Sequence, residues 1–270
     1  MKRVFKVIFG LNLVSLVYLL RLRPRQFLQA CSRAFTAATK ASSSRLREIP
    51  EISLDEILGD RKPVIRMPVM RYEDGMLPST QAMALISILV AEHPTEVLEI
   101  GTYMGYTTKL MAENLEDAII HTVDLPEDYV PEHDTTSGTP KDDFHLIRRR
   151  IVGREYKGIP CASRIRQHFG DTATWNFREA GHPGFFFIDG SHTYEYCKID
   201  TAKCFDLSGS SGVFLWHDCD EAHPGVVKCI LEWREMGRDV RRIAGTPLAY
   251  WKGSSNMPSG GNLGTPSIKV

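Results

Sequence analysis

The sequence has no excess of charge of either sign. Lysine and arginine together number 33, aspartate and glutamate together also number 33, and the formal net charge of the 270 residues is zero. Such a chain has no overall field that would attract a polyanion. We therefore expect no nucleic-acid partner and look for a site that acts on a small molecule.

Closely paired cysteines are also missing. The six cysteines are scattered and form no C-x-x-C pair: Cys31, Cys161, Cys197, Cys204, Cys219 and Cys229. A zinc site or a disulfide framework would need a closer or more regular spacing, so neither is expected. Reduced thiols in a cytoplasmic protein are the simpler interpretation, and Cys197 and Cys204 are expected in a hydrophobic core.

No apolar run near the N-terminus is long enough to cross a membrane. The segment Val7–Leu20 is interrupted by Asn12 and Ser15 and has basic residues on both sides. A spanning helix needs about 20 apolar residues, and no clear signal-peptide cleavage site follows. Three interpretations stay open: a helix on the membrane surface, peripheral to a cytoplasmic domain, a helix that binds a partner, or a helix that packs on the domain. A homo-oligomer is also compatible with the sequence.

The rest of the chain divides by composition and pattern. The expected segments are an apolar N-terminal helix at 1–25, a linker and helical extension at 26–78, a main domain at 79–252 and a disordered tail at 253–270. The tail is rich in glycine, serine and proline, a composition that buries too little apolar surface to fold.

Strands and helices alternate through the main domain. Helices are expected at 52–58 with Ser53 as a cap, 81–92 with Ser79 as a cap, 105–114, 144–156, 194–207 and 226–236. Strands are expected at 97–100, 119–123, 165–169, 185–188 and 213–216, with a hairpin at 240–243 and 248–251. This order predicts an α/β fold, a Rossmann-like, doubly wound, mostly parallel seven-stranded sheet with a C-terminal β-hairpin.

Acidic residues follow the ends of five of these strands. They are Glu99, Asp124, Asp171, Asp189 and Asp218. A single acid at a strand end is often only a turn residue or a helix cap. Ligands of open α/β sheets, however, bind at the carboxyl edge, where these five residues would meet. The pattern therefore predicts a binding site at that edge.

The loop Glu99–Gly105 carries two glycines after the first of these strands. Gly101 allows a tight turn, and Gly105 allows close approach of a helix or a ligand. The dinucleotide fingerprint G-x-G-x-x-G is absent, and an acid before the first glycine would repel a pyrophosphate. Such an acid suits a ligand with an ammonium and a sulfonium. Asp124 follows Glu99 by 25 residues, near the roughly 20-residue spacing of an acid that binds ribose hydroxyls.

The segment "LEIGTYMGYTT" resembles the first motif of class I S-adenosylmethionine-dependent methyltransferases, especially the catechol and caffeoyl-CoA O-methyltransferases. The stretch "FFFIDGSHTYEYCKID…GVFLWHD" resembles a bacterial group that includes sugar O-methyltransferases of macrolide pathways. The resemblance implies that S-adenosylmethionine binds at the carboxyl edge. It assigns cofactor contacts to Glu99, Gly101, Thr102, Gly105, Asp124, Asp171, Thr172 and Asp189, with Asp124 on the ribose, Asp171 and Thr172 at the adenine, and Asp189 near the methyl group.

The same resemblance places the methyl acceptor beside Asp189 and Asp218, which correspond to two carboxylate metal ligands. Hard oxygen ligands favour Mg²⁺. Catechol-type relatives have asparagine after the second aspartate, where this chain has Cys219, and Asp220 lies one position further on. The candidate metal ligands are therefore Asp189, Asp218 and Asp220, and the need for a metal stays open.

The candidate catalytic residues are His192 and Asp189. His192, three residues after Asp189, is the candidate general base, because imidazole titrates near neutral pH. His217 is a weaker candidate, and both could instead cap the next element or bond to backbone. The expected activity is O-methylation of a hydroxyl on a small-molecule acceptor such as a sugar or a phenol. Two alternatives stay open: a nicotinamide-dependent oxidoreductase, which Glu99 disfavours, and a cofactor-binding protein without catalysis.

One connection, residues 126–164, is longer than the others. Its first part, 126–143, is polar, and 144–156 is expected to be a basic helix with the run Arg148–Arg150. Long loops near a site often act as lids. The connection could cover the cofactor or bind an anionic acceptor, although a solvated helix face is the simpler interpretation of the arginines.

Overall fold

The computed structural model describes residues 45–68, 73, 75–129, 147, 150–208 and 211–253. The expected helix at 1–25, the start of the extension at 26–78 and the tail from 254 onward lie outside these residues. The chain divides into two units, residues 1–48 and 49–270, and the second contains the sheet. Within the described ranges, no helix combines the length and the apolar character needed to cross a membrane.

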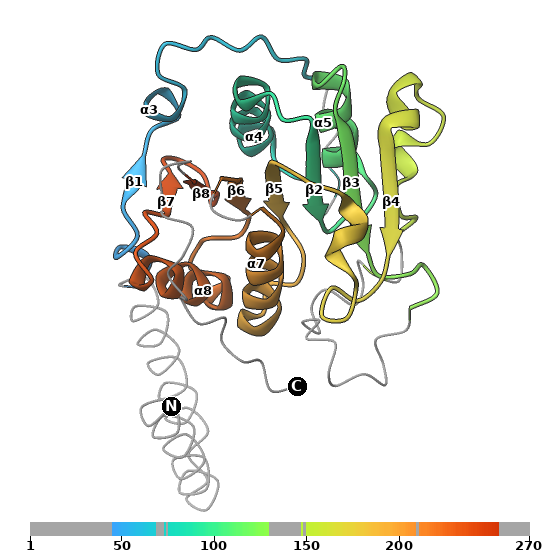
Figure 1. Cartoon of the computed structure of the whole chain (residues 1–270). Helices are drawn as coiled ribbons and strands as arrows, with labels where there is room; N and C mark the ends of the chain where they lie inside the picture. The colour runs from blue at the N-terminus through green and yellow to red at the C-terminus, as the bar shows by residue number, and fades with distance from the viewer. Residues whose placement is uncertain are drawn as a thin grey trace, which may run out of the picture. The chain divides into compact units, whose positions relative to one another are not determined.

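A single sheet of eight strands forms the centre of the second unit, in the order β1-β7-β8-β6-β5-β2-β3-β4 (Figure 1). Its strands are β1 (Glu51–Ile52), β2 (Glu96–Ile100), β3 (Ile119–Asp124), β4 (Ile165–Phe169), β5 (Phe185–Ile188), β6 (Val213–Trp216), β7 (Arg241–Ile243) and β8 (Ala249–Lys252). All neighbouring pairs are parallel except those that involve β8. The predicted α/β class and the C-terminal hairpin of β7 and β8 are confirmed.

The sheet has one strand more than the seven expected. The additional strand, β1, pairs in parallel with β7, and the Arg242 and Ala244 amides donate to the carbonyls of Pro50 and Ile52. A strand of two residues gives no alternation that a sequence pattern can reveal. Ile52 was expected to begin a helix and belongs instead to this strand.

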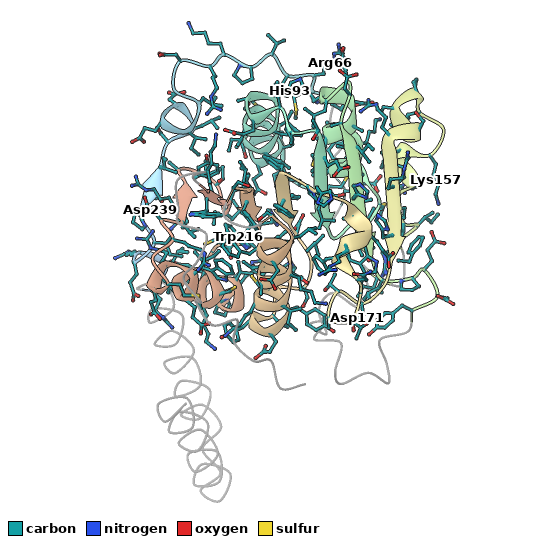
Figure 2. All side chains as sticks on the ribbon, in the orientation of Figure 1. Arg66, His93, Lys157, Asp171, Trp216 and Asp239 are labelled. Carbon is teal, nitrogen blue, oxygen red and sulfur yellow. The ribbon has the colours of Figure 1, made fainter. Side chains whose placement is uncertain are left out.

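Helices cover both faces of the sheet, as a doubly wound fold requires. One face packs α4 (Ser79–Glu92) and α5 (Tyr106–Asn114) against Phe185, Phe187 and Leu215. The opposite face is covered by α7 (Tyr194–Ser208) and α8 (Pro224–Glu235). There Phe205 of α7 and Trp233 of α8 contact each other, and the Trp216 indole N–H donates to Thr201 Oγ1 at 2.8 Å. Figure 2 shows Trp216 in the interior of this layer.

Of the two predicted helix caps, the one at Ser53 is present and the one at Ser79 is not. Ser53 caps α3 (Leu54–Leu58) through a capping box, in which Ser53 Oγ accepts from the Glu56 amide and the Glu56 carboxylate accepts from the Ser53 amide. Ser79, by contrast, is already the first residue of α4, and Pro78 holds the cap position with no side-chain hydrogen bond. The expected cap at Ser79 is wrong because the helix begins at Ser79 itself, two residues before the expected start at 81.

The connection after β3 is only partly described, and its expected helix at 144–156 is not continuous. Arg154–Tyr156 forms a 3₁₀ turn, η3, that follows Gly153 in the left-handed region, with φ of 70°. Tyr156 fills the space beside Gly153, where an added Cβ would lie 2.2 Å from the phenol oxygen. Arg150 is buried rather than part of a solvated helix face. The proposed lid at 126–143 lies mostly outside the described residues.

Candidate active site

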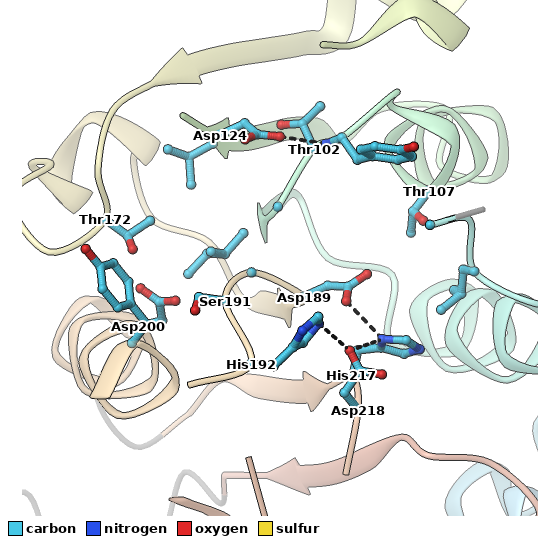
Figure 3. Close-up of a pocket in the computed structure, with 18 of the residues that line it drawn as sticks. Thr102, Thr107, Asp124, Thr172, Asp189, Ser191, His192, Asp200, His217 and Asp218 are labelled. Carbon is cyan, nitrogen blue, oxygen red and sulfur yellow. Dashed lines mark hydrogen bonds and ion pairs between the residues drawn. The ribbon is translucent and has the colours of Figure 1, made fainter. Parts of the chain in front are cut away.

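A cavity of about 550 Å³ opens at the carboxyl edge of the sheet, beyond β2, β3, β5 and β6 (Figure 3). Of the predicted site residues, it is lined by Gly101, Thr102, Asp124, Asp171, Thr172, Asp189, His192, Asp218 and Asp220. Figure 2 shows Asp171 just beyond the end of β4. The cavity thus lies at the sheet edge where the five acids predict a site, although two of the expected residues, Glu99 and Gly105, are absent from its lining.

Gly101 makes the turn that joins β2 to the cavity. Its φ is 93°, and a Cβ at this position would lie 2.1 Å from the carbonyl oxygen of Asp189. Only glycine tolerates both the backbone angle and the contact. Next to it, Thr102 Oγ1 lies 2.7 Å from Thr122 Oγ1 and accepts from Gln167 Nε2 at 3.1 Å. These contacts hold the turn against β3 and β4.

Glu99 lies beneath the cavity and is not part of its lining. Its side chain is fully buried, and one carboxyl oxygen accepts from Thr108 Oγ1 at 2.5 Å and Thr122 Oγ1 at 2.6 Å. Burial raises the pKa of Glu99 to about 8, although both hydroxyl donors oppose the shift. Glu99 thus lies below the lining, where it bonds to β3 and α5. Its other oxygen has no partner among the described residues, and its expected cofactor contact stays a prediction.

Gly105 also lies outside the cavity lining. It caps α5 with a φ of 82°, and an added Cβ would lie 2.6 Å from the Tyr156 ring and 2.8 Å from the Gly153 Cα. Its small size therefore admits the segment Gly153–Tyr156, and its expected cofactor contact stays a prediction. The sequence could not reveal this partner, which lies about 50 residues away.

Asp124 ends β3 with its carboxylate already well bonded. Oδ2 accepts from the Tyr103 amide and Oδ1 from the Leu125 amide, both at 2.7 Å, and Arg150 lies 3.3 Å from Oδ1. Burial raises the pKa of Asp124, while Arg150 and the amides act in the opposite direction. A carboxylate can accept about four hydrogen bonds, so capacity for a ligand remains. Sequence reasoning did not assign Arg150 to the site.

Asp171, Thr172 and Asp200 form one end of the cavity. Asp171 accepts from the Ala173 amide at 2.8 Å and from the Tyr196 hydroxyl at 3.0 Å. Asp200, on α7, is only 1% exposed, and its Oδ1 has no hydrogen-bond partner among the described residues. Burial raises the pKa of Asp200 to about 7. Sequence reasoning missed Asp200 because it lies inside a helix, away from the strand ends.

Asp189, His192, His217 and Asp218 gather at the other end (Figure 3). His192 Nε2 lies 2.7 Å from Asp218 Oδ2, and His217 Nδ1 lies 2.9 Å from the same oxygen and 3.0 Å from Asp189 Oδ1. The other ring nitrogen of His217 lies 2.7 Å from Gln81 Oε1, on α4. Both histidines named from the sequence therefore contact the predicted carboxylates.

Charge pairing dominates this end of the cavity. Burial disfavours the charged form of His217, but the two facing carboxylates outweigh it and raise its pKa well above the ordinary value. Burial likewise acts against the charged form of Asp218, whereas His192 and His217 lower its pKa far below the usual range. The two carboxylates therefore favour the charged form of the His217 imidazole.

The expected oxygen-only Mg²⁺ set is not assembled. Asp220 accepts from the amides of Ala222 and His223 and lies 2.9 Å from His223 Nδ1. Imidazoles thus lie against all three carboxylates, a donor set that does not suit Mg²⁺. Cys219 is fully buried and is not part of the lining. His223, which sequence reasoning missed, also lies 3.4 Å from Asp218 Oδ1.

Three other residues named from the sequence serve the fold. Cys197 and Cys204 are buried, as expected for core packing. Tyr194 begins α7, and its hydroxyl donates to the Glu232 carboxylate at 2.6 Å and accepts from Lys198 at 2.9 Å. Tyr194 is not part of the cavity lining.

Residues 98–219 match a family model described as "Methyltransferase domain". This match confirms the resemblance to methyltransferases over the segment that begins within β2 and ends just after β6. No protein of curated function matches the sequence.

Solved structures of methyltransferases are similar at low identity. The O-methyltransferase TomG of Streptomyces achromogenes, involved in tomaymycin synthesis and in complex with SAM, is 18% identical over 67% of this chain and 83% of its own, with a TM-score of 0.45. The SAH-bound methyltransferase PaMTH1 of Podospora anserina is 15% identical over 81% and 96%, also with a TM-score of 0.45. An O-methyltransferase of Bacillus cereus in complex with SAH is 16% identical over 61% and 71%, with a TM-score of 0.41. At such identities we transfer no residue role from these structures.

Proposed function

We propose that the protein is an S-adenosylmethionine-dependent methyltransferase that acts on a hydroxyl group of a small molecule. The observation that carries this proposal is a single cavity with two chemically different ends. One end joins Gly101, Asp124 and Asp171, and the other holds a cluster of imidazoles and carboxylates around Asp218. A cofactor held at the first end would present its reactive group to an acceptor at the second.

The cavity suits a cofactor of this kind. Its volume is typical of sites for such ligands, which occupy about 300–1,000 Å³. The unpartnered Oδ1 of Asp200 is a buried acceptor that an N–H group could satisfy. We assign the adenine to the end formed by Asp171, Thr172 and Asp200, the ribose to Asp124, and the methionine part to Gly101 and Thr102.

The reaction requires a base that takes the proton of the acceptor hydroxyl, whose oxygen must lie on the side of the methyl group opposite the sulfur. The bound cofactor supplies a methyl group on a sulfonium, which becomes a thioether when the acceptor oxygen forms its bond to the methyl carbon. The N–H at Nε2 of His192 would donate to Asp218, so that Nδ1 is the nitrogen that takes the hydroxyl proton. Asp218 would stabilise the resulting imidazolium, as the carboxylate does in a catalytic triad. Asp189 lies beside the methyl position.

Ligand binding tests the cofactor directly. Isothermal titration should give one site for S-adenosylmethionine or S-adenosylhomocysteine and no binding of NAD. Binding of NAD without S-adenosylmethionine would contradict the proposal and favour an oxidoreductase. Binding of the cofactor with no methylated product from any extract would favour a protein that only binds it.

Product trapping tests the acceptor. The protein, S-adenosylmethionine labelled in the methyl group and cell extracts are incubated together, and labelled small molecules are identified by mass spectrometry. We expect a product with the label on oxygen. A label found only on protein or nucleic acid would overturn the assignment to a small molecule.

A further inference from the structure

We propose that His192, Asp218 and His223 bind a divalent ion of the d-block metals, such as Zn²⁺, Co²⁺ or Mn²⁺, at the acceptor end of the cavity. This site differs from the oxygen set of Asp189, Asp218 and Asp220 expected from the sequence. The inference deepens the proposed function and rests on it for the ion's purpose, although the ligands are argued from geometry alone. With the ion bound, His192 would be a ligand, and the ion would lower the pKa of the acceptor hydroxyl in place of the imidazole base.

Three separate segments bring the ligands together. His192 follows β5, Asp218 follows β6, and His223 precedes α8. One oxygen of Asp218 lies 2.7 Å from His192 Nε2 and the other 3.4 Å from His223 Nδ1. The candidate ligand atoms of the three residues all lie within 4.8 Å of one another. Ligands about 2.0–2.2 Å from one ion fit within such a span.

The kind of donor selects the kind of metal. Two imidazoles and one carboxylate form the set that binds iron, zinc and other d-block ions, whereas Mg²⁺ prefers oxygen and keeps several waters. All three residues line the cavity, so that positions of the ion on the cavity side could receive the acceptor oxygen. Asp220, 2.9 Å from His223 Nδ1, could orient that ring or become a fourth ligand.

Charge at this end also favours a cation. Asp189, Asp218 and Asp220 bring three carboxylates into the cavity lining. Among the described lining residues the one permanent cation is Arg150, and it pairs with Asp124 near the cofactor loop. A divalent ion would compensate two of the three negative charges while His192 and His223 remain neutral ligands.

A second group of residues shares Asp218 and could compete for the ion. Asp189, His217 and Asp218 also bring their ligand atoms within 4.8 Å of one another. His217, however, is held by Gln81 on one side and lies against both carboxylates on the other. Both ring nitrogens of His217 thus already lie against other side chains, so we assign the ion to His192, Asp218 and His223.

Metal titration of the untagged full chain tests this site without any activity. After treatment with a chelator, the protein is titrated with Co²⁺, Zn²⁺ and Mg²⁺ by calorimetry, and Co²⁺ binding is followed by its visible d–d absorption. We expect one equivalent of Co²⁺ or Zn²⁺ to bind at least tenfold more tightly than Mg²⁺. His223→Gln should weaken Co²⁺ binding at least tenfold and alter the absorption.

Matched variants separate the possible outcomes. His182→Ala removes an exposed histidine that does not line the cavity and should leave Co²⁺ affinity unchanged. Unchanged affinity in both His223→Gln and His192→Gln, a loss only in His217→Gln, or a preference for Mg²⁺ would each overturn the assignment. So would the absence of binding at millimolar Co²⁺. Thermal melting of each variant confirms that it is folded.

The metal inference and the proposed function fail in different ways. The affinity for S-adenosylhomocysteine is measured by calorimetry on the same samples. If the wild-type protein binds this ligand but no metal, the metal inference is overturned and the methyltransferase proposal survives. If it binds Co²⁺ but neither S-adenosylhomocysteine nor S-adenosylmethionine, the metal site stands and the proposed function fails.

Discussion

His192 and Asp218 lie close enough for the carboxylate to fix the orientation of the imidazole, at 2.7 Å between Nε2 and Oδ2. Under the proposed function, and with no metal ion on His192, replacing this residue by alanine removes the proton acceptor. General-base catalysis contributes roughly 10²–10⁴-fold, so we expect kcat to fall within that range. The rate is measured on the acceptor identified by product trapping.

The affinity of this variant for S-adenosylhomocysteine is the control. It should stay close to the wild-type value, because His192 lies at the acceptor end of the cavity. A wild-type kcat in His192→Ala would show that another group takes the proton of the acceptor hydroxyl, or that this hydroxyl is acidic enough to lose it without a base.

Glu99 places a carboxyl group in the interior, where burial raises its pKa to about 8. The folded protein therefore holds this proton more strongly than the unfolded chain, and stability falls as the pH rises from about 4.5 to 8. Glu99→Gln removes this ionisation. We expect the melting temperature of the variant, relative to the wild type, to be higher at pH 9 than at pH 6.

Differential scanning fluorimetry at the two pH values measures this difference. Glu113→Gln, at a more exposed glutamate on α5, serves as the control. A difference in melting temperature that is the same at pH 6 and pH 9 would mean that Glu99 titrates at its ordinary value.

Strand and helix positions were largely predictable, because they depend on local pattern. Phe185–Ile188 and Val213–Trp216 are continuous apolar runs between turn residues, and the structure has strands at both. Acids after strands also located the cavity. What the sequence could not reveal are contacts over long separations. Gln81 reaches His217 across 136 positions, and Arg150, in a run of arginines, gives no local sign that it is buried.

At the scale of elements, α3 depends on its cap. The helix has only five residues, too few to be stable alone. In its capping box, the Ser53 amide donates to the Glu56 carboxylate and the Glu56 amide donates to Ser53 Oγ. We expect Ser53→Ala to reduce the free energy of unfolding by about 1 kcal/mol. Urea denaturation followed by circular dichroism measures the change.

Ser79→Ala is the matched comparison for this prediction. Ser79 was expected to cap α4 but makes no capping hydrogen bond, so the variant should lose much less stability than Ser53→Ala. An equal loss in the two variants would contradict the assignment of the caps.

At the scale of the whole molecule, every described residue that lines the cavity lies between Gly75 and Pro247. We therefore expect a variant that begins at residue 45 to bind S-adenosylhomocysteine with the affinity of the full chain. Calorimetry on both proteins, with thermal melting to confirm folding, measures this. A loss of tenfold or more would show that residues 1–44 contribute to the cofactor site.

The close approach of Gly101 to the carbonyl of Asp189 limits which loops this domain can exchange with related domains. The turn after β2 and the turn after β5 touch so closely that no side chain fits between them. The two loops therefore cannot be exchanged as independent modules between homologous domains. A chimera that imports a new loop after β5, in order to accept a different substrate, must import one that keeps the backbone of Asp189 in place. Recombination at this edge of the sheet should succeed only when both turns are transferred together.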